Sequence, residues 1–420
     1  MIHPERVSLG NGVRIVYAAS PANPFVAFLG SMAAGVAAEP AGQPGVAELT
    51  ARSLLGGTAK KSASQLARSI EGLGASLSFD NDAEALLFSG RCTRETAPRV
   101  LRVLREVQER PTFPEPEVEK ARAEIVSDLR EASDDTRARA FRDLLSRLYP
   151  RGHPYGRDPL GTEASARRIR PRDLAAFHRR AFTTAGMIVA FSGDVDRAFV
   201  EGTVAPILES IDLDGGSPRP VTPPSRPDPA TRTIRMPHKS QVDLAIGGPG
   251  IARNDPHYPA LSLGNLLFGR IGLMGRLGET VRDRQGLAYY SFSNLIARRA
   301  GGHVHVAVGV NPANVAAALG SVRSEMERLR TEPFSEEELD RGRRNQIGGL
   351  AVSLERNAEV VEELHRMEFY GLGLDYLERY PEIVHGTSGD AVRAAAAQFF
   401  DPNAMGLAAA GPLADLDVRL

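Results

Sequence analysis

The 420-residue sequence predicts an α+β fold of two tandem, homologous α/β-sandwich domains joined by a proline-rich linker. The first observation is length, because one hydrophobic core rarely organises a chain of this size. The second is the stretch DLDGGSPRPVTPPSRPDPATR, whose Pro and Gly residues disfavour both helix and central strand. The third is that the sequences on either side of this stretch resemble each other. We therefore place a domain at 1–211, an extended, semi-rigid linker at 212–232 and a second domain at 233–420.

Two alignments within the chain indicate a duplication. FHRRAFTTAGMIVAFSGDVD, before the linker, aligns with AAQFFDPNAMGLAAAGPLAD, near the C-terminus. Phe182 then matches Phe400 and Gly193 matches Gly411, at a constant offset of 218 positions. PTFPEPEVEKARAEI aligns with EPFSEEELDRGRRNQI at an offset of 221 positions. Two such close offsets predict a duplicated domain with small insertions.

Each half has the same expected order of elements. Apolar residues that alternate or form short continuous runs predict strands in the first half at 12–20, 24–32, 75–92 and 187–195. The same patterns predict strands in the second half at 231–237, 241–249, 286–310 and 405–411. A helix follows the opening pair of strands, and long amphipathic helices precede the last strand. This order is typical of an α+β sandwich.

Composition and charge exclude several classes of partner. The 51 Lys and Arg residues almost cancel the 52 Asp and Glu residues, so no global field favours nucleic acid or an anionic membrane. The N-terminus lacks a basic region followed by an apolar run, and no apolar stretch could cross a bilayer, so we expect a cytoplasmic chain. The single cysteine, Cys92, excludes an internal disulfide and a cysteine-rich zinc site, and we expect it to be buried and inert.

The segment GVAELTARSLLGGT, at 45–58, has the pattern of a metal-bearing helix without its ligands. A helix with the motif His-x-x-Glu-His places two imidazoles on one face for zinc, while the glutamate activates the bound water. The segment resembles the one that carries this motif in the pitrilysin or insulinase family of zinc peptidases, the inverzincins. In that register Glu48 stands at the first histidine, Ala51 at the general base and Arg52 at the second histidine.

The resemblance covers most of the chain, including RGHPYGRDPLGTEASARRIRPRDLAAFHRRAF at 151–182. It implies that Asp128 replaces the glutamate that is the third metal ligand, and that Ala121 replaces a further acidic residue. Arg52 would place a permanent positive charge where a cation would sit. We therefore expect neither metal nor cofactor in this chain. We expect instead an ion pair between Glu48 and Arg52, spaced i and i+4, with Asp128 completing a triad.

Two further pairs of polar residues have ordinary structural interpretations. His303 and His305 alternate along a strand and point to the same side, which predicts a polar strand face rather than a metal site. Glu362 and His365, spaced i and i+3, predict a solvated helix pair. No Ser-His-Asp or Cys-His pattern is recognisable, and GRIGLMGRLG is too irregular for a nucleotide-binding loop.

The segment MGRLGETVRDRQGLAYYSFSNL resembles the C-terminal segment of the same family, in which an Arg and a Tyr reach the active site of the opposing half. The resemblance implies these roles for Arg282 and Tyr289. RLGETVRDRQ has a helical pattern, Gly286 can end the helix in a left-handed conformation, and LAYYSFS continues as a strand. Tyr290 would face the other side of the sheet and pack beneath helices. The ordinary alternative is an arginine at a helix end and a tyrosine packed in the sheet.

The resemblance implies a division of labour between two chains. Some bacterial members pair a zinc-bearing chain with a homologous zinc-free chain around a chamber that admits unfolded peptides. We therefore expect a zinc-free subunit of a heterodimeric peptidase, with zinc in a His-x-x-Glu-His partner. Its Arg282 and Tyr289 would stabilise the developing oxyanion.

Two other functions stay open on the sequence alone. A non-catalytic scaffold or a peptide-binding homodimer is the main alternative, because core subunits of a mitochondrial respiratory complex resemble this fold. The zinc-free subunit of the mitochondrial processing peptidase has a glycine-rich loop, whereas LLFGRIGLMGRLG is shorter and poorer in glycine, so presequence processing is not expected. Independent hydrolysis with an unconventional metal lacks recognisable ligands.

Overall fold

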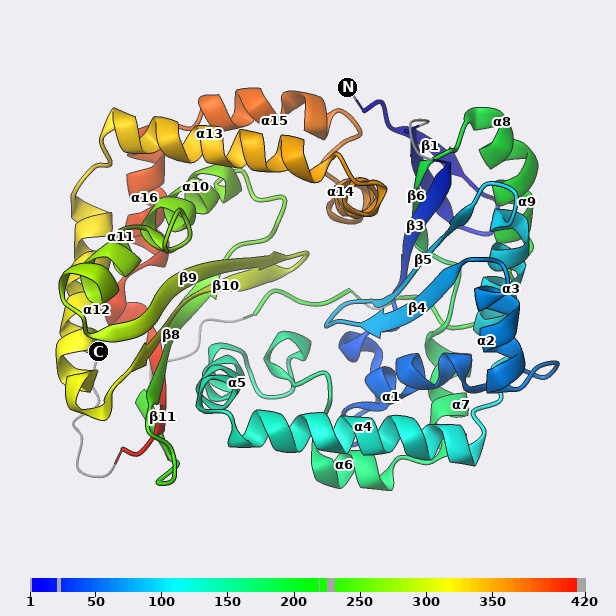
Figure 1. The fold of residues 1–420 in the computed structure, drawn as a ribbon, viewed down its shortest axis with the longest axis horizontal. Coiled ribbons are helices and arrows are strands. Elements are labelled where there is room, and N and C mark those ends of the chain that lie inside the picture. Colours follow the sequence, from blue (N-terminus) through cyan, green and yellow to red (C-terminus); the bar gives the residue numbers. More distant parts are fainter. Residues whose placement is uncertain (1, 21–23, 219, 225–230, 414–420) are drawn as a thin grey trace. The chain divides into compact units, whose positions relative to one another are not determined.

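The computed structural model describes residues 2–20, 24–218, 220–224 and 231–413. These residues form two compact units, each assembled from three stretches of sequence (Figure 1). Within the described ranges, unit 1 comprises Met1–Leu129, Arg157–Val221 and Val352–Glu378. Unit 2 comprises Arg130–Gly156, Thr222–Ala351 and Arg379–Leu420. The expected linker at 212–232 is only partly described, because residues 219 and 225–230 lie outside these ranges.

Unit 1 contains a six-stranded mixed sheet in the order β1-β2-β6-β3-β5-β4. Its strands are β1 (Glu5–Ser8), β2 (Arg14–Ala19), β3 (Phe25–Met32), β4 (Ser76–Asn81), β5 (Leu86–Thr93) and β6 (Ile188–Gly193). Neighbouring strands are antiparallel except β2 and β6, which are parallel. Five of the six strands lie in the expected ranges. The sequence does not predict β1, because this four-residue edge strand is mostly exposed and carries little apolar signal.

Unit 2 contains a five-stranded sheet in the order β7-β11-β8-β10-β9. Its strands are β7 (Thr231–Arg235), β8 (Val242–Gly250), β9 (Ala288–Arg298), β10 (Gly301–Val310) and β11 (Gly406–Gly411). The parallel pair is β7 and β11, and the other neighbours are antiparallel. Without β1, the sheet of unit 1 has this same order and orientation. The predicted α+β fold of two tandem, homologous domains is confirmed.

Helices surround both sheets. Those wholly or mostly in unit 1 are α1 (Val46–Ser53), α2 (Ala63–Glu71), α3 (Ala97–Glu109), α4 (Glu115–Asp134), α6 (Glu163–Arg168), α7 (Pro171–Ala181), α8 (Arg197–Phe199), α9 (Ala205–Glu209) and α14 (Asn357–Tyr370). Those wholly or mostly in unit 2 are α5 (Thr136–Leu148), α10 (Tyr258–Gly269), α11 (Gly275–Leu277), α12 (Val315–Thr331), α13 (Glu336–Ser353), α15 (Tyr376–His385) and α16 (Gly389–Phe399). Short 3₁₀ or π turns are η1 (Val36–Ala38), η2 (Leu54–Gly56), η3 (Pro154–Gly156), η4 (Val200–Val204), η5 (Gly278–Arg284), η6 (Pro312–Asn314) and η7 (Pro402–Ala404). Among the described residues, no helix combines the length and the apolar character that a bilayer crossing requires.

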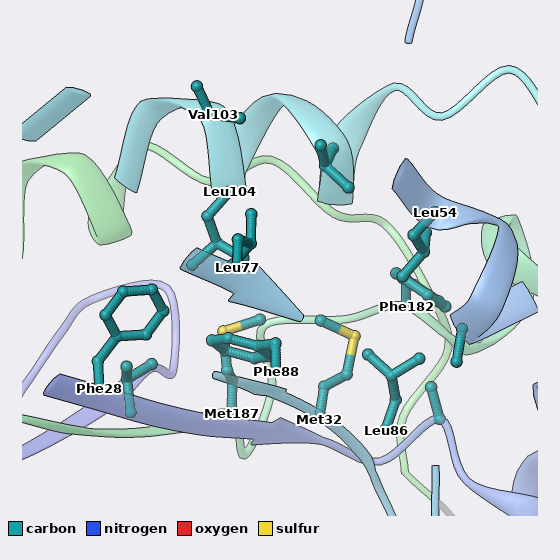
Figure 2. Packing of buried hydrophobic residues seen from close by; sticks show 14 of the residues in the cluster. Phe28, Met32, Leu54, Leu77, Leu86, Phe88, Val103, Leu104, Phe182 and Met187 are labelled. Atoms are coloured by element: carbon teal, nitrogen blue, oxygen red, sulfur yellow. The ribbon is translucent and has the colours of Figure 1, made fainter. Parts of the chain in front are cut away.

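The sheet of unit 1 is buried on both faces. Phe28 of β3 points into the main core, where Figure 2 shows Met32 and Phe88 packed near Leu104 of α3. Ala27, the residue before Phe28 in β3, points to the other face of the sheet. The helix α14 covers that face with apolar side chains. Burial on both faces explains why β6 is apolar along its length rather than alternating.

The sheet of unit 2 is organised in the same way. Leu244 of β8 and Val306 of β10 belong to a core that also includes side chains of α10, α12 and α16. The opposite face, which includes Ala245 and Ala307, is covered by α5.

Each half of the sequence therefore contributes one helix to the unit formed mainly by the other half. The helix α14 follows the linker yet packs on β2, β3 and β6 of unit 1, and α5 precedes the linker yet packs on β8 and β11 of unit 2 (Figure 1). Nothing in the apolar periodicity of these helices predicts which sheet each one covers.

Candidate functional site

The helix α1 carries the positions of the lost metal motif, and a buried carboxylate fixes its start. Gly45 precedes the helix with a left-handed φ of 88°. One carboxylate oxygen of Glu39 accepts hydrogen bonds from the backbone N–H groups of Gly45 and Ala47, at 2.8 and 3.2 Å. Burial raises the pKa of Glu39 to about 7, although Arg157, at 3.2 Å, and both amides oppose the shift. These two hydrogen bonds satisfy backbone donors that the first turn of α1 would otherwise leave unpaired.

Glu48, Arg52 and Asp128 form the expected ion triad. Arg52 Nε donates to Glu48 Oε1 at 2.6 Å, and Arg52 Nη1 donates to Asp128 Oδ2 at 2.8 Å. Glu48 is buried, and this burial raises the pKa of its carboxyl despite the hydrogen bond from Arg52. Burial lowers the pKa of Arg52, but hydrogen bonds to both carboxylates outweigh it and raise the pKa. The guanidinium is therefore the fixed cation of this locus.

The residues at this locus do not fit a zinc ion. Ala51, at the general-base position, is buried in the core of unit 1 and offers no titratable group. Ala121 is likewise a buried core residue. The two carboxylates already bind Arg52, whose charge would repel a divalent cation. Over the residues that the structure describes, no three His, Cys, Asp or Glu side chains are grouped so that they could hold a metal.

Arg282 and Tyr289 lie at the junction of a helix and a strand. The expected helix is present, but η5 is a π-helix, and Gly286 ends it with φ 61°. Arg282 Nε donates to the neighbouring Asp283 at 2.8 Å, and this contact raises the pKa of the guanidinium. Tyr289 is 63% exposed, and within the described ranges its hydroxyl has no hydrogen-bond partner. No hydrogen bond in the described structure joins Arg282 to Tyr289.

Tyr289 occupies an irregularity in the sheet. Tyr290 pairs with Gly309 of β10 and Ala288 pairs with Val310, so Tyr289 has no opposite residue. Such bulges redirect a side chain and recur next to active sites.

Tyr290 is tied down beneath α5. Its hydroxyl donates to Asp243 of β8, which also accepts from Thr136 of α5 and from Gln241. Arg137 of α5 lies over the Tyr290 ring, 5.0 Å from its centroid. Burial, followed by the bond to Asp243, raises the pKa of Tyr290 strongly. The expected packing of Tyr290 under a helix is present.

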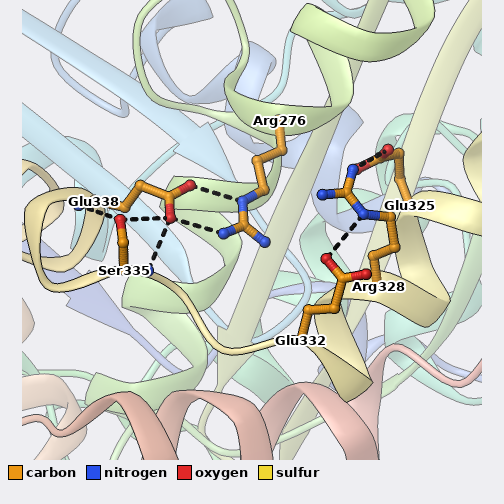
Figure 3. Close-up of polar contacts among 6 residues, drawn as sticks. All are labelled: Arg276, Glu325, Arg328, Glu332, Ser335 and Glu338. Carbon is orange, nitrogen blue, oxygen red and sulfur yellow. Dashed lines mark hydrogen bonds and ion pairs between the residues drawn. The ribbon is translucent and has the colours of Figure 1, made fainter.

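A bidentate ion pair anchors the segment before η5 (Figure 3). Arg276 of α11 donates through Nε and Nη2 to the two oxygens of Glu338, each at 2.8 Å. Its guanidinium also lies 4.0 Å from the ring centroid of Phe334. Burial raises the pKa of Glu338, but bonds from Arg276 and Ser335 outweigh it and lower the pKa to about 2. The start of η5 is thus fixed to α13. Figure 3 also shows Arg328 of α12 paired with Glu325 of the same helix and with Glu332, the residue that directly follows it.

His303 and His305 do point to the same side of β10, but that face is covered rather than open. Both rings are buried beside Phe141 of α5, and His303 Nδ1 lies 2.8 Å from the Tyr149 hydroxyl. Burial, followed by nearby positive charges, lowers the pKa of both imidazoles, that of His305 to about 4. They are neutral near pH 7.

The interpretation of Glu362 and His365 as a solvated pair is wrong for the histidine. His365 of α14 is buried, and its Nε2 lies 2.7 Å from Ser31 Oγ of β3. Burial lowers the pKa of His365 to about 4. The two partners are separated by 334 positions, so no local pattern could reveal the contact. Cys92 is buried as expected, and burial raises the pKa of its thiol to about 12.

Two protein-family models match most of the chain. Residues 14–163 match the model described as insulinase (peptidase family M16), and residues 168–346 match the peptidase M16 inactive domain. The second match begins at residue 168, before the linker, and therefore includes the end of the first half of the duplication.

Several similar proteins come from bacteria. An uncharacterized zinc protease of Mycobacterium bovis is 26% identical over 88% of this chain and 84% of its own length. A protein named non-peptidase homolog YmxG, from Helicobacter pylori, is 23% identical over 80% of this chain and 77% of its own length. The crystal structure of a peptidase M16 inactive domain from Pseudomonas fluorescens has a TM-score of 0.91 and 27% identity, covering 97% of this chain and 98% of that one.

Proposed function

Because the chain belongs to the insulinase family, peptidase family M16, we propose that it is the zinc-free subunit of a two-chain zinc peptidase. The observation that carries this proposal is the triad of Glu48, Arg52 and Asp128, where a guanidinium stands in the place of a metal. A chain with this triad needs zinc from elsewhere to hydrolyse a peptide. The source is a homologous partner chain that bears His-x-x-Glu-His.

Arg282 and Tyr289 are this chain's contribution to the shared site. Tyr289 is exposed and its hydroxyl has no hydrogen-bond partner among the described residues, which supports this role because a tyrosine that served only packing would bury its ring. The π-helix around Arg282 supports it too, since such distortions are frequent at functional sites. The segment that carries Arg282 and Tyr289 is fixed on both sides. Arg276, before it, binds Glu338, and Tyr290, after it, binds Asp243.

The chemistry of the two residues is electrophilic. When a nucleophile attacks a peptide carbonyl, negative charge develops on the carbonyl oxygen, and a phenol hydroxyl and a guanidinium can stabilise it. The partner's zinc would supply the activated water. Unfolded peptides are the substrate class of this proposal.

The test measures hydrolysis of an unstructured peptide by this chain, by the His-x-x-Glu-His partner and by their mixture. We expect activity only in the mixture, and a loss of about 10²-fold or more in the rate constant with Tyr289→Phe or Arg282→Ala. Arg284→Ala, two residues from Arg282, and Tyr258→Phe are matched controls that should leave the rate unchanged. Full activity of the partner alone, or a mixture indifferent to both variants, would overturn the proposal.

The second candidate is a non-catalytic scaffold or peptide-binding homodimer. The name of the Helicobacter pylori relative, a non-peptidase homolog, favours it. A homodimer that binds peptides and gains no activity from any His-x-x-Glu-His chain would support this alternative.

A further inference from the structure

The turn between β1 and β2 contains the one asparagine of the sequence that is followed by glycine, Asn11 before Gly12. The backbone N–H of Leu9 donates to the carbonyl oxygen of Val13 at 2.8 Å and closes the hairpin loop. Gly12 has a left-handed φ of 92°, a conformation that short hairpin loops require at this place. Asparagine before glycine is prone to deamidation, because glycine has no Cβ to hinder the approach of its backbone nitrogen to the asparagine amide.

Deamidation requires water and no other reactant. The backbone nitrogen of Gly12 loses its proton and attacks Cγ of Asn11, so that a new C–N bond forms and the bond from Cγ to Nδ2 breaks. The Nδ2 group takes up the proton and leaves as ammonia, and the two residues become a cyclic imide. Water then opens the imide at either of its two carbonyl groups, which yields aspartate or isoaspartate. No electrons are exchanged with an oxidant or a reductant.

In the folded chain the side-chain amide of Asn11 is held by hydrogen bonds. Its Nδ2 group donates to the backbone oxygens of Leu208 and Glu209 at 2.9 and 3.2 Å. Its Oδ1 atom accepts from the backbone N–H of Val13 at 3.2 Å. The amide must give up these bonds before Cγ can turn toward the nitrogen that attacks it.

The peptide unit that contains the attacking nitrogen is held as well. The N–H of Gly12 donates to the carbonyl oxygen of Leu9 at 3.1 Å. The other end of the same peptide unit, the carbonyl oxygen of Asn11, accepts from the hydroxyl of the buried Thr184 at 2.8 Å. The attack changes the position of this peptide unit, so it breaks both bonds. Deamidation therefore requires the turn to open locally.

The products of deamidation do not fit the closed turn. Nδ2 of Asn11 lies at the C-terminal end of α9, where carbonyl groups lack partners within the helix. A carboxylate oxygen in its place has no hydrogen to donate, and it would repel both carbonyl oxygens. The carboxylate of Glu209, which accepts from the N–H of Gly10 at 3.2 Å, adds a further negative charge. Isoaspartate also lengthens the backbone of the turn by one carbon atom.

We propose that Asn11 is a site of spontaneous deamidation, that the folded turn suppresses the reaction, and that the product keeps the turn from closing. A reversible opening of the turn thus becomes a permanent covalent change. This inference goes beyond the proposed function, because it involves neither zinc nor a partner chain nor Arg282 and Tyr289.

Trypsin provides a direct measurement, because it releases residues 7–14 as the peptide VSLGNGVR, in which Asn11 is the only side-chain amide. The full chain is incubated at mildly alkaline pH, and mass spectrometry of the digest follows the conversion to aspartate and isoaspartate. The synthetic peptide VSLGNGVR gives the rate without the fold. We expect the folded chain to react at least about tenfold more slowly than the peptide, and the chain in urea to react like the peptide.

A variant that loosens the turn tests the protection by the fold. Thr184→Val removes the hydroxyl and keeps the shape of the side chain, so it should speed the reaction of the folded chain about fivefold. Thr331→Val, the same change at an exposed position in unit 2, is the control and should leave the rate unchanged.

A second pair of variants tests the effect of the product. Asn11→Asp reproduces one product and should lower the urea midpoint of the chain, whereas Asn345→Asp, at an exposed position of α13, should not. The rate comparison uses the unaltered chain, so it decides the matter even where a variant fails to fold. Equal rates in the folded chain and the peptide, no acceleration by Thr184→Val, or equal midpoints of the two aspartate variants would overturn the proposal.

Discussion

Gly30 of β3 and Phe88 of β5 face each other so closely that a Cβ atom on Gly30 would lie 2.1 Å from the Phe88 ring. Two residues along the same strand pair the arrangement is reversed, and a Cβ on Gly90 would lie 2.4 Å from Phe28. Each ring occupies the place of a side chain missing from the opposite strand. The core in Figure 2 depends on this exchange.

Gly30→Ala should therefore destabilise unit 1 by about 1 to 3 kcal/mol, because the Phe88 ring must move within a packed core. Urea unfolding and hydrogen exchange of β3 and β5 measure the effect. Gly320→Ala, in α12, has open space around the new methyl group and should be neutral or slightly stabilising. Equal stability of the two variants would contradict the argument.

Removal of Arg52 should cost more than removal of an exposed arginine with the same spacing. Arg52→Leu leaves the buried Glu48 beside Asp128 without a cation, which we expect to destabilise unit 1 by about 1 to 3 kcal/mol. Arg167→Leu, which breaks the exposed pair with Glu163, should cost no more than about 1 kcal/mol. Denaturant unfolding of both variants gives the comparison. A smaller loss with Arg52→Leu than with Arg167→Leu would refute the structural role of the triad.

Zinc and EDTA should leave the stability of this chain unchanged. A metal that binds only the folded state raises the unfolding midpoint in proportion to the logarithm of its concentration. Because Arg52 fills the locus, we expect thermal unfolding to be the same with excess zinc and with EDTA. A midpoint that rises steadily with zinc concentration would reveal a site that the described residues do not form.

Glu39 should make the stability of unit 1 depend on pH. Its pKa is raised from the ordinary value of 4.5 to about 7, so the folded state holds the proton more tightly than the unfolded chain. The stabilising contribution is therefore complete below about pH 4.5 and is lost as the pH rises to about 7, by up to about 3 kcal/mol.

Glu39→Gln places a side chain that cannot ionise at this position, so it removes the contribution of Glu39 to the dependence of the free energy of unfolding on pH. The difference in free energy of unfolding between the unaltered chain and Glu39→Gln should fall between pH 4.5 and pH 7. Arg157→Gln should steepen the fall, because the arginine opposes the shift. A difference that stays constant across this interval would contradict the assignment to Glu39.

The strands of this protein could be predicted from sequence because their signal is local. Only β1 escapes, since ERVS is exposed and too short to show alternation. The triad could be predicted only in part from local sequence. The i and i+4 spacing indicates the pair of Glu48 and Arg52, whereas the place of Asp128 followed only from the resemblance to the family. The contact between Ser31 and His365 joins segments that are far apart in the sequence. The residues around Ser31 do not indicate that it contacts His365, and those around His365 do not indicate Ser31.

The π-helical form of η5 and the bulge at Tyr289 also escape prediction. Both arise where a helix must end and feed a strand whose next residue, Tyr290, is held by Asp243. Periodicity locates the helix and the strand, but the residue that holds Tyr290, Asp243, lies on β8, far away in the sequence.

The reciprocal placement of α5 and α14 limits how this chain can be divided. A gene split at 212–232 would yield two polypeptides. The first would contain α5 but lack the α14 that covers its own sheet, and the second would contain α14 but lack the α5 that covers its own sheet. Neither product could reach its native fold in isolation, and a protease that cut the linker would leave the pieces held together. The proline-rich stretch that separates the repeats in sequence is therefore no boundary for folding, and the smallest self-sufficient piece of this protein contains both repeats.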